Sequence, residues 1–209
     1  MQERSNLEHG YEQAIEILIG DLAGIENIEK QCLKCGAELS AVGAGKAIFL
    51  TYFSRKYRVL LPDVEITLSD SGESVSLKDR VLILHYLTTE RGNGINGALI
   101  TFKELPQGIN YFPVFYSRAI KPLLNNFGET PERLLTKAAD FSGRRAEYGD
   151  VSVTVDAFSR VPITLVMWRG DEEFAPEGNI LFDSSITDYL STYAITELCE
   201  TLAWRLIKG

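Results

Sequence analysis

The sequence predicts an α+β fold, in which a mostly antiparallel sheet built from hairpins combines with helices at the N-terminus, in the middle and at the C-terminus. Two observations predict this arrangement. Apolar residues recur at helical intervals in those three regions, whereas alternating and β-branched runs stand in adjacent groups with no helical segment between them. Grouped strands favour hairpins over a repeating strand–helix–strand order.

Size and composition predict a single globular domain over residues 1–209. The chain is 45% hydrophobic and 24% charged, which is typical of globular proteins. Single domains commonly reach about 200 to 250 residues. No Pro/Ser-rich or low-complexity stretch interrupts the sequence, so we expect no linker.

Two helices are expected before the first strand. A second, short helix should run from about Ile25 to Cys35, where Gly36 can adopt the left-handed conformation that ends a helix. The first helix is predicted by five residues that share one face: Leu7, Tyr11, Ala14, Leu18 and Leu22.

A meander of strands and a buried helix should follow. The runs Ala47–Phe53, Tyr57–Leu61 and Val64–Leu68 are β-branched, aromatic or alternating, which predicts antiparallel strands. Ser76 then has the spacing of a helix cap, and the helix that it opens is apolar nearly all round up to Leu87.

The middle of the chain predicts one short strand and two helices. Ala98–Phe102 is the strand. Pro113 can begin a helix that Pro122 should kink and that Gly128 ends. Thr130 precedes a proline in the manner of a helix cap, so a further helix is expected to reach about residue 143.

The C-terminal part predicts three strands and a last helix. Between Val151 and Asp156 valines alternate with polar residues, which predicts a strand with one solvent-exposed face. Val161–Trp168 and Asn179–Phe182 are the next strands. The helix Ile195–Leu206 carries an apolar stripe that includes Cys199.

Charge restricts the classes of partner. The chain has 29 acidic and 21 basic residues and a formal charge of −8, which disfavours nucleic-acid binding because that binding relies on Lys and Arg at phosphates. No apolar run approaches the roughly 18 residues of a membrane span, so no membrane is expected. Three cysteines are too few for a disulfide scaffold and agree with a cytoplasmic location.

Two short motifs resemble cofactor sites. Residues 92–97 match G-x-G-x-x-G, but they follow a predicted helix and precede a strand, the reverse of a dinucleotide site, so we interpret them as a connecting loop. Cys32 and Cys35 form a C-x-x-C pair, but only Cys199, His9 and His85 remain to complete a metal site. We favour their packing as small core residues, and no cofactor or metal ligand is assigned.

An acidic loop after the strand Val161–Trp168 is the most suggestive segment. Asp171, Glu172 and Glu173 are consecutive, and Asp183 follows after the next strand. These carboxylates could bind a hard cation or act as acid and base. The favoured alternative is a solvated turn followed by a helix cap.

Four further side chains deserve separate interpretations. His85 lies in the apolar helix and is expected to be a hydrogen-bonded core residue, since no nucleophile motif accompanies it. Arg118 is a candidate anion contact, and Trp168 adjoins the acidic loop. Trp204 lies opposite the stripe of the last helix; we expect it to pack internally, with a contact surface as the alternative.

Several phrases resemble the domain-of-unknown-function family 3786 from about Tyr11 to Lys208. The resemblance implies no activity. It implies that the family occurs largely in anaerobic bacteria and archaea. It also implies that some family members have an iron–sulfur module ahead of this domain. The phrases that carry it are residues 58–63 (RVLLPD), 83–87 (ILHYL) and 102–106 (FKELP), Arg118 with Pro122-Leu123, and 170–174 (GDEEF) through Leu181-Phe182-Asp183.

Three functions follow as hypotheses. The first is a binding or accessory module that recognises a partner protein or a cofactor in anaerobic metabolism, with the acidic loop, His85, Arg118 and Trp168 as contacts. The second is an enzyme that uses the carboxylates of the acidic loop and Asp183, with Arg118 at an anionic substrate and a divalent ion as an optional cofactor. The third is a homodimer with Trp204 in its interface.

Overall fold

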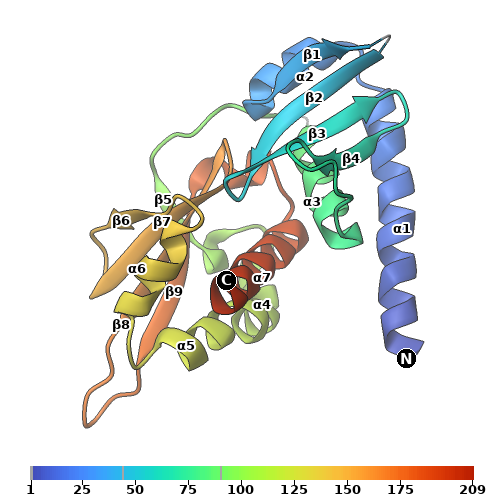
Figure 1. The fold of residues 1–209 in the computed structure, drawn as a ribbon. Coiled ribbons are helices and arrows are strands. Elements are labelled where there is room, and N and C mark those ends of the chain that lie inside the picture. The colour runs from blue at the N-terminus through green and yellow to red at the C-terminus, as the bar shows by residue number, and fades with distance from the viewer. Residues whose placement is uncertain (1, 44, 90) are drawn as a thin grey trace.

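The computed structural model describes residues 2–43, 45–89 and 91–209, and in the first helix it describes the side chains of Asn6 and of residues 8–23. The predicted α+β class is confirmed, with helices around a mostly antiparallel sheet (Figure 1). The helices are α1 (Gln2–Ala23), α2 (Ile28–Cys35), α3 (Leu77–Leu87), α4 (Gly108–Phe115), α5 (Lys121–Phe127), α6 (Glu132–Ala139) and α7 (Thr192–Lys208). The strands are β1 (Glu38–Val42), β2 (Gly45–Tyr52), β3 (Arg55–Leu61), β4 (Glu65–Leu68), β5 (Leu99–Thr101), β6 (Arg144–Ala146), β7 (Val151–Phe158), β8 (Val161–Trp168) and β9 (Glu177–Asp183).

Side-chain caps explain where two helices begin. The Asn27 side chain accepts a hydrogen bond from the backbone N–H of Lys30, so α2 begins at Ile28, three residues later than expected. Gly36 has φ 60° and ends that helix as predicted. The Ser76 hydroxyl accepts the N–H of Asp79 and thereby caps α3.

The middle helix differs from its prediction. It begins at Gly108, so Pro113 lies inside α4 instead of starting it. The kink expected at Pro122 is a π-helical turn, Tyr116–Ile120, in which the N–H of Lys121 bonds the carbonyl of Tyr116. A proline removes a backbone donor and crowds the preceding turn, so the wider π-turn relieves that crowding.

Two strands were not predicted, and one helix is shorter than expected. β1 pairs along β2, and β6 pairs with residues 152–154 of β7. Both strands are short and contain no fully buried residue, so their own sequences carry little alternation of apolar and polar residues. Because the chain turns into β6, α6 ends at Ala139 instead of near residue 143.

The sheet consists of two groups of strands that meet at one point. Its order is β4-β3-β2-β7-β8-β9-β5, with β1 and β6 at the sides of β2 and β7. Between β2 and β7 the register contains only the pair Tyr52 and Phe158. The backbone N–H of Phe53 adds a hydrogen bond to the carbonyl of Ala157 at 2.9 Å. Side chains must therefore supply most of the contact between the two groups.

The expectation of a solvent-exposed face on β7 is wrong at its centre. Ser152 is 1% exposed, and its hydroxyl accepts the backbone N–H of Tyr148. Thr154 is half-buried and shares a hydrogen bond with Thr164 on β8. The polar residues of this strand are small and hydrogen-bonded, so they can be covered at little cost.

Helix α7 provides the centre of the core. The predicted apolar stripe is buried, and the helix packs beside α3, α4, α5 and α6 (Figure 1). The buried members of the stripe are Ile195, Leu198, Cys199, Leu202 and Leu206. Among the helices in the described ranges, none has the length and apolar character needed to cross a membrane.

Gly108 is the glycine for which we predict the largest cost of substitution. A Cβ at this position would collide with the backbone oxygen of Phe102, whereas a Cβ on Gly20 in α1 would meet no atom within 4 Å. Gly108→Ala should therefore lower the free energy of unfolding by about 2 kcal/mol or more. Gly20→Ala should raise it by up to about 1 kcal/mol, because alanine favours a helix. Urea denaturation of both variants measures the difference, and equal effects would contradict the packing around Gly108.

Candidate functional site

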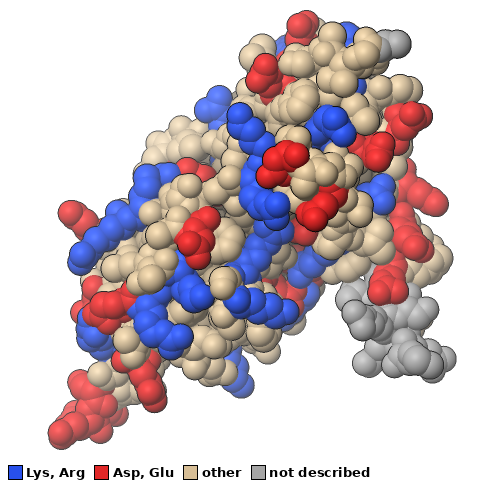
Figure 2. Space-filling model, viewed as in Figure 1, with Lys and Arg blue, Asp and Glu red and all other residues tan. Residues whose placement is uncertain are grey.

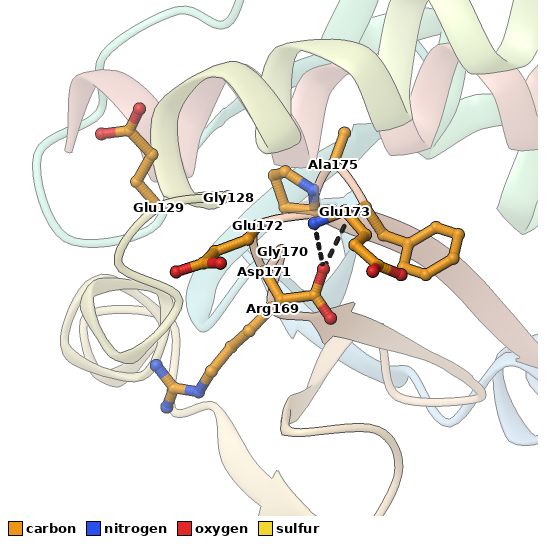
Figure 3. Close-up of a pocket in the computed structure, with 10 residues that line it drawn as sticks. Gly128, Glu129, Arg169, Gly170, Asp171, Glu172, Glu173 and Ala175 are labelled. Carbon is orange, nitrogen blue, oxygen red and sulfur yellow. Dashed lines mark hydrogen bonds between the residues drawn. The ribbon is translucent and has the colours of Figure 1, made fainter.

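The acidic loop forms an open pocket of about 590 Å³ at the tip of the β8–β9 hairpin, lined by residues 169–176 with Gly128 and Glu129 (Figure 3). The Asp171 carboxylate accepts the backbone N–H groups of Glu173 and Phe174, both at 2.8 Å. These bonds lower the pKa of Asp171. This arrangement is a hydrogen-bonded turn.

The carboxylates of this loop do not converge. Those of Glu172 and Glu173 point to opposite sides of the loop in Figure 3. Within the described residues, no group of three or more His, Cys, Asp or Glu side chains is placed to hold a metal ion. The loop also projects away from α1 and α3 (Figure 1), and neither His85 nor Arg118 lines its pocket.

Trp168 and Asp183 lie at the ends of neighbouring strands but have different surroundings. Trp168 ends β8 and is 40% exposed. Asp183 ends β9, is 2% exposed, and accepts the backbone N–H groups of Asn96 at 3.1 Å and Gly97 at 2.6 Å. Burial alone would raise the pKa of Asp183, but hydrogen bonds from Ser185, Asn96 and Gly97 lower it. Asp183 therefore holds the glycine-rich segment 92–97, which is a connecting loop as expected.

We predict that Asp183→Ala loosens this loop. The N–H groups of Asn96 and Gly97 would lose the buried carboxylate that accepts them, so the variant should be about 2 kcal/mol less stable. Limited proteolysis should then cut near residues 92–97 faster than in the parent protein. Asp171→Ala is the matched control, because its carboxylate bonds only exposed backbone. Equal proteolysis of the two variants would count against an anchoring role for Asp183.

The strongest cluster of charged side chains lies on α7. Glu197 is 3% exposed, and its carboxylate lies 3.0 Å from Lys78 Nζ on α3 and 2.5 Å from Arg118 Nη2. Glu200, one turn later, lies 2.5 Å from Lys78 and 2.6 Å from Arg118. The Tyr11 hydroxyl on α1 donates to Glu197 at 3.0 Å. We call these five residues the Glu197 cluster.

Opposite charges set the ionisation of this cluster. Burial alone would raise the pKa of Glu197, but the Lys78 ammonium and the Arg118 guanidinium lower it by more. Burial and the neighbouring Glu197 carboxylate raise the pKa of Tyr11. Glu197 is therefore ionised at neutral pH, and Tyr11 keeps the proton that it donates.

Arg118 reaches this cluster from the π-helical turn. Its pKa is raised because its hydrogen bonds and ion pairs with Glu200 and Glu197 outweigh the opposing effect of burial. Two carboxylates of the same chain already engage its guanidinium. In this structure the Arg118 guanidinium is engaged by Glu197 and Glu200, and its contact with an external anion stays a prediction.

A cavity of about 400 Å³ opens between α1, α3 and α7, beside the Glu197 cluster. We call it the α1–α3–α7 cavity. Its apolar wall is formed by Ala14, Ile17, Leu18, Val81, Leu82 and Ala194. Its polar groups are Asn6, Tyr11, Lys78, His85, Tyr193 and Glu197.

His85 is the only predicted site residue that lines this cavity. It lies on α3, it is half-buried, and its Nε2 is 3.5 Å from the Ser191 hydroxyl. Its partner there is a side chain at the start of α7, so the expectation of a core histidine holds only in part. His85 and Arg118 thus approach the same part of α7, whereas the acidic loop and Trp168 lie elsewhere.

Sequence reasoning missed Tyr11, Lys78, Tyr193 and Glu197. The sequence offered no signal for Glu197, because this residue lies on the side of α7 opposite the apolar stripe, where a charged side chain is ordinary. Its burial and the identity of its partners depend on how three distant helices pack.

The cysteine pair is buried in α2. Cys32 is 2% and Cys35 is 1% exposed. Burial raises the pKa of the Cys32 thiol to about 11 and that of Cys35 to about 12. The Cys35 thiol donates to the carbonyl of Tyr86 at 3.3 Å. Thiols that are covered and protonated are weak nucleophiles, so this pair packs as the sequence favoured.

The expectation that Trp204 packs internally is wrong. The residue is 44% exposed on α7. It lies on the side of the helix away from the buried stripe, and no described element covers that side near Trp204. The alternative of a contact surface therefore stands.

We predict a pH-dependent contribution from Glu197. Because its folded pKa is lowered, its stabilisation is present above the unfolded value of about 4.3 and is lost as the pH falls through the folded pKa. Glu197→Gln should cost about 3 kcal/mol at neutral pH.

The difference between this variant and the parent should shrink below about pH 4, where the parent carboxylate also gains a proton. Urea denaturation at several pH values measures it. Glu172→Gln, at an exposed loop position, is the control and should change stability little at any pH. A constant difference for Glu197→Gln from neutral to acid pH would contradict the ionised cluster.

Comparisons with known proteins bear on the family. The model of a family described as a domain of unknown function (DUF3786) matches residues 27–205, a span that covers α2 to most of α7. No curated protein and no solved structure matches the chain. Helix α1 and its contribution to the cavity precede the matched span. On this match, the chain belongs to the DUF3786 family.

Proposed function

We propose that this protein is a binding module that holds a small, largely apolar molecule in the α1–α3–α7 cavity. One observation carries the proposal: apolar side chains from three helices line a space of about 400 Å³, and three of its polar groups, Tyr11, Lys78 and Glu197, contact one another. Sites for small molecules and cofactors typically have this size and composition. The open pocket at the acidic loop is larger but is lined mainly by polar and exposed residues.

The polar groups suggest how the ligand would be oriented. Tyr193 is 49% exposed, and burial together with Glu197 raises its pKa, so it offers a hydroxyl at neutral pH. His85 offers a ring nitrogen on the opposite helix. Lys78 and Glu197 neutralise each other in the wall. A neutral ligand with one hydroxyl, carbonyl or amide group matches this lining better than an ion does.

The rim of the cavity has apolar surface to cover. Ile17 lines the cavity and is 65% exposed. A ligand in contact with Ile17 would remove apolar surface from water, which favours binding by about 25 cal/mol per Å² covered. Helix α1 thus supplies both a wall of the cavity and an exposed apolar residue at its rim.

The wider expectations belong to the same proposal. A single domain, a cytoplasmic location and a role in anaerobic metabolism rest on composition and on the family resemblance. A partner protein would be recognised elsewhere on the surface. The carboxylate-based enzyme has no observation in its favour, because the acidic residues lie apart from His85 and Arg118.

Binding of 1-aminoanthracene, a neutral fluorophore of three fused rings, tests the cavity. We expect saturable fluorescence enhancement with one site per chain. Val81→Trp should fill the cavity and weaken binding by about tenfold or more, a loss of about 1.4 kcal/mol. Val114→Trp is the matched control, since Val114 is also on a helix, is 40% exposed and does not line the cavity.

A second variant guards against misfolding of the first. Ile17→Glu changes an exposed rim residue, so it should leave the urea midpoint nearly unchanged while weakening the binding of the fluorophore. Circular dichroism of all variants confirms the fold. Non-saturable binding of 1-aminoanthracene, or equal affinity of Val81→Trp, Ile17→Glu and Val114→Trp for it, would contradict the proposed function.

A further inference from the structure

A second concave surface lies at the end of α7, between that helix and the β2–β3 turn. It encloses about 660 Å³. Its charged and aromatic lining consists of one carboxylate, Glu200, four cations and two rings: Arg55, Lys78, Arg205, Lys208, Phe141 and Trp204. We call it the C-terminal groove. It shares only Lys78 with the α1–α3–α7 cavity.

The groove is basic although the chain carries a formal charge of −8. Figure 2 shows blue side chains gathered across the middle of this face, where α7 ends, while red side chains gather at the tip of the β8–β9 hairpin and along α1. Like charges on one face create a local positive potential that attracts anions.

Internal pairs neutralise some of the groove's cations but not all of them. Lys78 is paired within the Glu197 cluster, and Arg205 Nη2 lies 2.8 Å from Asp79 Oδ1. Arg55 and Lys208 have no carboxylate within ion-pair distance among the residues that the structure describes. These two exposed side chains therefore supply the positive charge that an anion would meet.

The same groove exposes an aromatic face. Trp204 is 44% exposed, and Lys208 Nζ lies 5.6 Å from its ring centroid. Phe141 also lines the groove and is half-buried against Phe53. A planar ring can stack on an exposed indole, and a neighbouring cation can at the same time contact an anionic group of the same ligand.

The turn that presents Arg55 departs from local sequence preference. Phe53 and Ser54 have φ of 45° and 61°, at the two central positions of a hairpin turn where Asn-Gly is preferred. Phe53 is 1% exposed and is held by packing against Tyr52 and by the Arg205 guanidinium, 4.9 Å from its ring. The tertiary structure thus fixes this turn, and with it the position of Arg55 opposite α7.

From these observations we propose that the C-terminal groove binds a nucleoside phosphate, with the base against Trp204 and the phosphates near Arg55 and Lys208. The ligand must carry both a planar ring and a compact negative charge, because the groove offers both partners side by side. A long polyanion would also meet the acidic surroundings of a chain with net charge −8.

Tryptophan fluorescence tests the proposal with ADP as the probe. The chain has two tryptophans, so Trp168→Phe leaves Trp204 as the single reporter. ADP should quench its emission saturably, and added KCl should weaken binding because charge contributes. Adenosine carries only the planar base and pyrophosphate only the phosphates, so each should bind at least about tenfold more weakly than ADP.

Charge-reversal variants locate the site. In the Trp168→Phe background, Lys208→Glu and Arg55→Glu should each weaken ADP about tenfold or more. Lys46→Glu is the matched control, because it reverses the charge of an exposed lysine near the start of β2, whereas Tyr52 ends that strand beside the groove. The affinity of this variant for ADP should stay within about twofold of the parent's. Binding of 1-aminoanthracene should be unaffected by Lys208→Glu, since Lys208 does not line the other cavity.

Each contrary result would contradict a particular part of the nucleotide-binding proposal. An absence of saturable quenching by ADP, or an equal loss in Lys46→Glu, excludes the groove as the site. Pyrophosphate as tight as ADP excludes the stacked ring, and adenosine as tight as ADP excludes the phosphate contact. Tighter binding of a single-stranded oligodeoxythymidine than of ADP would replace the mononucleotide by a nucleic acid.

Discussion

A carboxylate in the interior of the protein is the constraint on which the arrangement of the helices depends. Glu197 lies on the most buried helix, and an ionised group there is costly unless opposite charges accompany it. Lys78 from α3 and Arg118 from the π-helical turn meet this requirement, and Tyr11 from α1 adds a hydrogen bond. One side chain thereby determines where three other elements must lie.

A second polar contact connects the helices with the sheet. The Tyr52 hydroxyl on β2 donates to Asp79 at 2.9 Å, and Arg205 on α7 pairs with the same carboxylate oxygen. Tyr52 also stacks on Phe158, whose ring in turn stacks on Tyr86 at 4.2 Å. The two strand groups share only one pair in their register, so this aromatic stack and the hydrogen bond from Phe53 to Ala157 join them.

These two contacts also explain where the concave surfaces lie. The α1–α3–α7 cavity opens on one side of Lys78, and the C-terminal groove opens on another. Helix α7 contributes to both, with Tyr193 at its start and Trp204 near its end. The cavity is mostly apolar because the charges of the Glu197 cluster pair with one another. The groove is basic because, among the described residues, Arg55 and Lys208 have no carboxylate within ion-pair distance.

Local sequence alone determined the class of fold and most elements. The strand Val161–Trp168, the apolar stripe of α7 and the cap at Ser76 depend on a few neighbouring residues each, and all three formed as predicted. The short strands β1 and β6 escaped prediction, because their pairing and not their composition makes them strands.

The tertiary structure decided the rest, including every contact of the candidate sites. Asp183 was a candidate ligand contact with a helix cap as the favoured alternative, and its side chain does cap the short 3-10 helix Ser184–Asp188. Its additional hydrogen bonds to the segment 92–97 depend on the tertiary structure alone. Trp204 was expected inside and lies outside, because a helical pattern shows which side of a helix is less apolar but not whether another element covers it. Lys78, Arg118 and Glu197 are 40 and 79 residues apart in succession, so only the packing of their helices brings their charges together.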